Sequence, residues 1–92
     1  MKYRISIVED ADAELCKVPV FYRRQIAQMI IDLLGTEPER ESRARIKRLI
    51  QPAASVYRLR VGDYRVFYDV VGSMVIVMHV RHKDDTEELY GR

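Results

Sequence analysis

Residues 56–70 read VYRLRVGDYRVFYDV, and this stretch decides the fold. Two runs of alternating residues flank the pair Gly62-Asp63, a pattern typical of a β-hairpin closed by a two-residue turn. With the turn at this pair, Arg60 lies directly opposite Arg65, and directly opposed side chains point to the same side of a sheet. One side then carries Tyr57, Leu59, Val61, Tyr64, Val66 and Tyr68. The other side carries Arg58, Arg60, Arg65 and Phe67.

Like charges in opposed positions destabilise a hairpin, so this arrangement calls for an explanation. Residues 40–65 hold eight basic and two acidic residues, a surplus of +6, whereas the rest of the chain has eight basic and twelve acidic residues, or −4. A local surplus of this size attracts polyanions, and the arginine fork matches the geometry of phosphate. The alternative is an ordinary ion network, in which Asp69 or the acids of the tail pair with these arginines.

The segments before the hairpin predict one strand and two helices. Residues 2–8 alternate and predict a strand. A short helix with Asp10 as its N-cap follows, and it ends at Pro19. A second helix is predicted from Pro19 to Gly35, because apolar residues there recur at helical spacing. This stripe, which we assign to the core rather than to a cofactor site, consists of Tyr22, Ile26, Met29, Ile30 and Leu33.

Residues 36–54 admit two interpretations, a short helix or an extended basic loop. In the first, one face of the helix carries Ile46, Leu49 and Ile50. After the hairpin, Gly72-Ser73 predicts a second tight turn, which leads into an apolar strand over residues 74–81.

This order of elements, β-α-α-β-β-β, predicts one α+β domain over residues 1–92. We expect a small antiparallel sheet of about four strands, with both N-terminal helices packed on one face. The arginine side of the hairpin then faces away from the helices as a shallow open groove. Besides the arginines, that open face should display Phe67 and, depending on register, Ile76 and Met78.

Composition narrows the classes of function. No apolar run approaches the roughly 20 residues of a membrane span, and the first residues do not form a signal peptide, so we expect no membrane partner. The single cysteine, Cys16, fits a reducing cytoplasm, where we expect the protein to reside. Cys16, His79 and His82 show no metal-ligand spacing, so we expect neither a metal nor a cofactor.

The core YRLRVGDYRV, the apolar run VIVMHV and a charged tail with Tyr90 near its end resemble the RelE/ParE superfamily of bacterial toxins. The resemblance covers essentially the whole chain. It implies a small cytoplasmic toxin of a type II toxin–antitoxin system, with a cognate antitoxin protein as its partner. Toxins of the RelE type cleave messenger RNA in the ribosomal A site, whereas those of the ParE type inhibit DNA gyrase and are not nucleases.

The RelE type is favoured, which implies that the ribosome and mRNA are further partners. In that type, hairpin basic residues hold the scissile phosphate and a C-terminal tyrosine assists. The matching positions here are Arg58, Arg60, Arg65 and Tyr90. One position departs from the family pattern. RelE-type toxins usually have a basic residue shortly before this tyrosine, and its counterpart here is Asp84, so the identity of the general acid stays open.

The residues themselves suggest how RNA cleavage would be divided among them. We expect Arg65, with Arg60 beside it, to stabilise the charged phosphorane. His82 is the candidate for proton transfer, since histidine titrates near neutral pH, and Tyr90 either stacks on a base or handles a proton. The residues expected to bind phosphate or RNA are Arg58, Lys47, Arg48, Arg81 and Lys83. The alternatives are a gyrase inhibitor of the ParE type and a non-toxic interaction module of the same fold.

Overall fold

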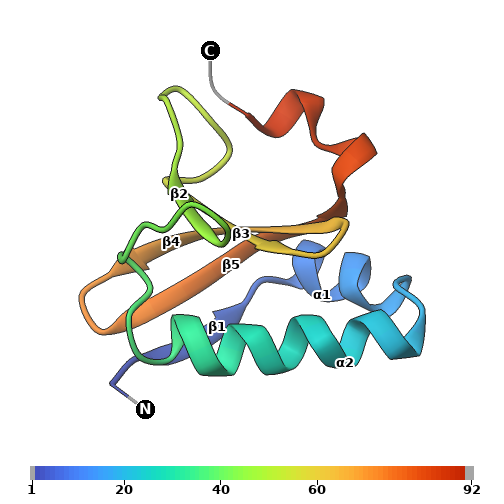
Figure 1. The fold of residues 1–92 in the computed structure, drawn as a ribbon, viewed down its shortest axis with the longest axis horizontal. Helices are drawn as coiled ribbons and strands as arrows, with labels where there is room; N and C mark the ends of the chain where they lie inside the picture. The colour runs from blue at the N-terminus through green and yellow to red at the C-terminus, as the bar shows by residue number, and fades with distance from the viewer. Residues whose placement is uncertain (1, 91–92) are drawn as a thin grey trace.

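A five-stranded sheet organises the protein, whose structure is a computed structural model that describes residues 2–90 (Figure 1). The strands lie in the order β1-β5-β4-β3-β2. Their bounds are β1 Arg4–Ile7, β2 Ile46–Arg48, β3 Tyr57–Val61, β4 Tyr64–Val71 and β5 Met74–His82. The helices are α1 Glu9–Cys16 and α2 Val20–Met29, which continues as a π-helical turn over Ile30–Leu34. Two 3₁₀ turns, Lys83–Asp85 and Glu87–Leu89, form the tail.

The central hairpin has the predicted register. Arg60 pairs with Arg65 and Tyr57 with Tyr68, around a turn in which Gly62 has a φ of +58°. The second turn is also as predicted, and Gly72 there has a φ of +60°. These positive φ values suit glycine, which has no Cβ to clash with the backbone.

The α+β class is confirmed, with two differences in the sheet. It has five strands instead of about four, because residues 36–54 take the extended interpretation and β2 pairs with β3. It is also mixed, because β1 pairs with β5 in parallel. The two helices follow β1 directly and cover one face before the chain enters the other strands (Figure 1). Asp10 lies inside the first turn of α1, whose N-cap is Val8, so the predicted cap was wrong.

The main core lies between the sheet and the two helices. The apolar side of the hairpin faces this core, and Leu59, Val66 and Tyr68 are fully buried there. Ile26 of α2 and Val77 of β5 are fully buried in the same cluster. Among residues 2–90, no helix is long and apolar enough to cross a membrane.

A second, smaller cluster covers part of the opposite face. The tail and the loop after β2 both lie on the side of the sheet away from α2 (Figure 1). Phe67 is fully buried here, against Leu49 of the loop and Leu89 of the tail. The expectation that Phe67 is displayed on an open face was therefore wrong. What remains accessible on this face is its arginine-bearing part.

Candidate functional site

Four basic side chains of β2, β3 and β4 project from the face of the sheet opposite the helices. Lys47 of β2 pairs with Arg58 of β3, and Arg60 of β3 pairs with Arg65 of β4. Opposed residues project to the same side, and Arg58 and Arg60 are two positions apart on one strand, so all four project together. We call Lys47, Arg58, Arg60 and Arg65 the cationic face.

No carboxylate compensates the charge of the cationic face within the part of the chain that the structure describes. None of its four residues takes part in the ion pairs of residues 2–90. Asp69 instead accepts the backbone N–H of Val56 at 2.6 Å, and Glu88 of the tail pairs with Arg81. The ion-network alternative is therefore wrong for these residues.

Arg58 lies at the centre of the cationic face and is half-buried. Burial lowers the pKa of its guanidinium, Tyr90 raises it, and the charges of Arg65 and Arg60 lower it further. Its Nε is buried without a hydrogen-bond partner among the described residues. Burial and the neighbouring arginines thus make the charge of Arg58 less favourable than it is in water, and a bound anion would offset this cost.

Arg65 is held in place by its own turn. Its Nη1 donates to the carbonyl of Gly62 at 2.8 Å and to the carbonyl of Tyr64 at 2.9 Å. These two contacts fix the guanidinium at the end of the hairpin, whereas the opposed Arg60 is exposed. Such preorganisation is what a group needs if it is to stabilise charge that develops during a reaction.

Tyr90 lies at the border of the cationic face. Its ring packs edge-on against Phe67, with the ring centroids 5.2 Å apart, and its hydroxyl influences the pKa of Arg58. The preceding residue, Leu89, accepts the backbone N–H of Ala54 at 3.0 Å. The structure therefore brings together Tyr90 and the hairpin arginines, as the sequence suggested.

Arg48 and Lys83 were expected to bind RNA, but neither is part of the cationic face: Arg48 lies on the other side of the sheet, and Lys83 pairs with an acid of the hairpin turn. Arg48 pairs with Tyr57, on the helix side, where its Nη1 is 3.2 Å from the Tyr57 hydroxyl. Lys83 lies beside the hairpin turn, with its Nζ 3.7 Å from a carboxylate oxygen of Asp63.

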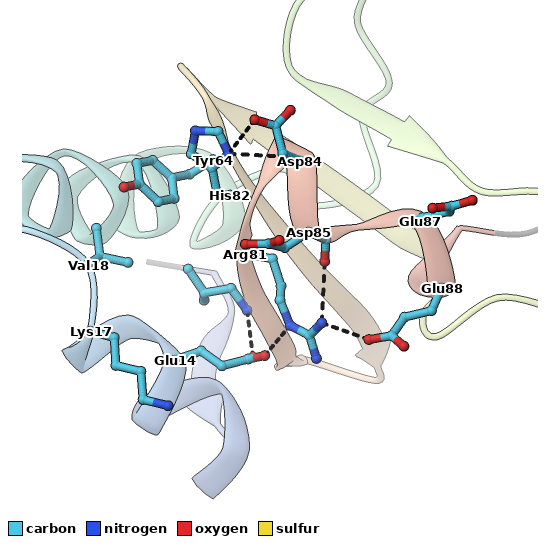
Figure 2. Close-up of a pocket in the computed structure, with 11 residues that line it drawn as sticks. Glu14, Lys17, Val18, Tyr64, Arg81, His82, Asp84, Asp85, Glu87 and Glu88 are labelled. Atoms are coloured by element: carbon cyan, nitrogen blue, oxygen red, sulfur yellow. Dashed lines mark hydrogen bonds and ion pairs between the residues drawn. The ribbon is translucent and has the colours of Figure 1, made fainter.

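Arg81, a further expected RNA ligand, is also committed elsewhere (Figure 2). It pairs with Arg65 across β4 and β5, but its guanidinium contacts Glu14 of α1 and Glu88 of the tail. It also donates to the carbonyl of Asp85 at 3.3 Å.

His82 is not brought together with Arg65, so the expected acid–base partner is missing from the cationic face. It pairs with Tyr64, whose ring it meets edge-on at 5.4 Å, and both side chains project to the helix side. Its Nδ1 accepts the backbone N–H of Asp84 at 3.2 Å (Figure 2). Asp84, at the position where the resemblance implies a basic residue, thus faces His82.

Glu14 was missed from the sequence. It accepts the backbone N–H of Val80 at 3.1 Å and also contacts His79 and Arg81, both more than 60 residues away. One glutamate in an acidic helix shows no pattern that could have indicated these contacts.

Several solved structures share this fold. A RelBE toxin–antitoxin complex from Mycobacterium tuberculosis matches with 24% identity and a TM-score of 0.76, over 89% of this chain and 99% of that chain. An archaeal RelE–RelB complex from Pyrococcus horikoshii matches with 25% identity and a TM-score of 0.74, over 92% and 99%. A mutant of the E. coli toxin RelE in the free state matches with 23% identity and a TM-score of 0.68, over 95% and 90%.

Sequence comparison agrees with the structural matches. No curated protein matches the chain significantly. A family model, described as ParE toxin of the type II toxin–antitoxin system parDE, matches residues 5–86, which is most of the chain. Together with the structural matches, this confirms the resemblance to the RelE/ParE superfamily. The chain therefore belongs to the ParE toxin family of type II toxin–antitoxin systems.

Proposed function

We propose that this toxin cleaves messenger RNA on the ribosome, with the cationic face holding the RNA at the scissile phosphate. One observation carries the proposal: four basic side chains converge on one face without a carboxylate partner among residues 2–90, and Tyr90 borders them. The repulsion among these cations is relieved when a polyanion binds, and RNA supplies closely spaced phosphates.

The cleavage step uses the RNA's own 2′-hydroxyl. Its oxygen attacks the adjacent phosphorus, the bond to the leaving 5′-oxygen breaks, and the 2′-proton leaves as the 5′-oxygen gains one. Negative charge grows on the phosphorane, where Arg65 is held by its turn and Arg60 stands opposite. Lys47 pairs with Arg58, which lies two residues before Arg60 on β3. These two side chains would therefore hold the neighbouring phosphate.

Proton transfer is the weak part of this site. Tyr90 borders the cationic face, but a phenol and a guanidinium are both weak acids, which makes them poor proton donors. His82, the residue better suited to neutral pH, projects to the other side of the sheet. The reaction would therefore depend on the ribosome to align the RNA, because alignment can replace much of the missing acid–base help.

We expect ribosome-bound mRNA to be cut at least about 100-fold faster than naked RNA of the same sequence, since alignment contributes factors of this size or larger. The measurement is the initial rate of cleavage by purified toxin, with product ends mapped on a gel. Equal rates on both substrates would contradict the role of the ribosome.

The second candidate is inhibition of DNA gyrase without nuclease chemistry. The matched family model is named for ParE, and His82 lies on the other side of the sheet from Arg65, and both observations favour a binder. A supercoiling assay with purified gyrase separates the two functions. Loss of supercoiling together with intact ribosome-bound mRNA would replace our proposal, and harmless overexpression would favour the non-toxic interaction module.

The cationic face also provides a docking surface for the acidic residues of the antitoxin. We expect a variant with Arg58→Gln, Arg60→Gln and Arg65→Gln to bind the antitoxin with an association rate at least about tenfold lower at low salt, because charge on an interface mainly accelerates encounter. Stopped-flow measurements over a salt series give this rate.

The matched control removes three positive charges elsewhere, at Lys2, Arg4 and Arg24, each of which is exposed. Equal slowing by both triple variants would show that net charge alone steers the encounter. Unchanged association in the Arg58/Arg60/Arg65 variant would place the antitoxin on another surface, such as the helical face.

A further inference from the structure

A chain of charged contacts links α1 to the tail on one side of the molecule. Arg81 lies between Glu14 and Glu88, and its Nη1 is 2.9 Å from a carboxylate oxygen of Glu88 (Figure 2). We call Glu14, Arg81 and Glu88 the tail latch. It borders an open groove of about 850 Å³ between α1 and the tail.

Glu14 is the fixed end of the tail latch. β1 pairs with only the first part of β5, Met74 to Val77, so the later residues of β5 have no strand neighbour on that edge among the residues that the structure describes. The Glu14 carboxylate occupies this edge and accepts the N–H of Val80, while His79 Nδ1 lies 3.2 Å away. Its side chain is only 19% exposed, so these donors are needed to offset its desolvation.

The tail has little stability of its own. It consists of two 3₁₀ turns of three residues each, which are too short to persist without outside contacts. Four carboxylates lie within five residues and repel one another, at Asp84, Asp85, Glu87 and Glu88. Arg81 is placed to offset this charge, because it binds Glu88 and the carbonyl of Asp85 at once.

The far end of the tail reaches the cationic face. Leu89 is buried in the second cluster and accepts the N–H of Ala54, and Tyr90 follows it onto Phe67. Glu88 and Tyr90 are two residues apart, so a shift of the latched turn moves the tyrosine with it.

We infer that Glu14 and Arg81 are positioning residues, which hold Tyr90 beside Arg58 by clamping the tail through Glu88. The importance of this for RNA cleavage rests on the proposed function, whereas the coupling between the tail latch and Tyr90 does not. α1 thereby contributes to the position of Tyr90, although it packs against β5 and not against the hairpin arginines.

Amide hydrogen exchange measured by NMR on the whole protein tests the coupling directly. The N–H groups of Ala54 and Leu89 report opening of the tail, because they donate to Leu89 and Thr86 respectively. We expect Glu88→Gln to accelerate their exchange about two- to fivefold, as suits an ion pair with one exposed partner. Arg81→Gln should accelerate them further, and amides of the central strands should be unchanged in the Glu88→Gln protein.

Glu87→Gln is the matched control, since Glu87 is exposed and forms no ion pair within residues 2–90. Equal acceleration by Glu87→Gln and Glu88→Gln would overturn the tail latch, because it would trace the effect to the charge of the tail as a whole. Unchanged exchange at Ala54 and Leu89 in Glu88→Gln would overturn it as well. Arg81→Gln leaves Glu14 short of a donor and could impair folding, so the test relies on Glu88→Gln.

A kinetic arm connects the tail latch to the proposed function. With ribosome-bound mRNA, Glu88→Gln should lower kcat and leave KM nearly unchanged, because the cationic face that binds RNA is intact. A rise in KM with unchanged kcat would overturn the positioning role. If Glu88→Gln accelerates exchange but the wild-type protein cuts no RNA, the coupling is supported and the proposed nuclease activity is rejected. Failure of the tail latch can therefore be distinguished from failure of the proposed function.

Discussion

Arg65→Ala should lower the rate of cleavage of ribosome-bound mRNA by roughly 10² to 10³, the range found when one preorganised donor to a developing oxyanion is removed. Arg65 is the member of the cationic face whose guanidinium is fixed, through the carbonyls of Gly62 and Tyr64. Water can satisfy those carbonyls in the variant, so the fold should persist. The measurement is kcat on ribosome-bound mRNA, together with a thermal melt.

The matched control is Arg24→Ala, because Arg24 is an exposed arginine on α2 without an ion pair among residues 2–90. It should cut RNA at the wild-type rate. Arg60→Ala should show a smaller loss than Arg65→Ala, since its side chain is exposed, and its melting temperature should rise slightly as repulsion is relieved. Near-normal cleavage by Arg65→Ala would place the reacting phosphate elsewhere.

The hairpin was predictable because the information that determines it is local. Alternation with a period of two and a glycine at a turn fix which residues oppose each other, so Arg60 and Arg65 could be paired from sequence. The side to which the charged residues near the turn project could be predicted without knowing any contact between distant segments. Most of the cationic face could therefore be predicted from the sequence, whereas the packing of neighbouring segments at its border could not.

His82 was misplaced because of one extra residue in β5. A regular ladder counted from the turn at Gly72-Ser73 would pair Phe67 with Met78 and project His82 to the same side as Arg65. The structure has a bulge there, since Tyr68 pairs with Val77 but Phe67 pairs with His79. A single extra residue moves every later side chain to the other side of the sheet. No residue in VIVMHV is a recognisable sequence signal for a bulge.

The covered part of the opposite face depends on contacts between distant segments. Leu49 and Leu89 meet over Phe67 although 40 residues separate them in the chain. Similarly, the spacing of Ile46 and Leu49 suits one face of a helix, but in the structure the two residues lie in different clusters on either side of the sheet. In the structure this segment is extended because β2 pairs with the edge of β3. A local sequence pattern contains no information about such pairing between distant segments.

Phe67→Ala should lower the free energy of unfolding by about 3–4 kcal/mol, the usual cost of truncating a fully buried phenylalanine. Phe67 is 0% exposed and contacts two distant segments, because Leu49 of the loop after β2 and Leu89 and Tyr90 of the tail all pack around its ring. The cavity would remove the surface on which the tail rests, so the amides of Ala54 and Leu89 should lose protection as well. Urea denaturation followed by circular dichroism gives the free energy.

Phe21→Ala is the control that makes this measurement decisive, because it deletes the same ring from a site on α2 that is 66% exposed. Its cost should stay within about 0.5 kcal/mol, as for most surface substitutions. Similar costs for the two variants would mean that the tail and the loop after β2 do not cover Phe67 in solution, and that the open face expected from the sequence is the correct one. A large cost for Phe67→Ala alone, together with lost protection at Leu89, would establish the tail as part of the folded unit, and Tyr90 is then held beside Arg58 by packing as well as by the tail latch.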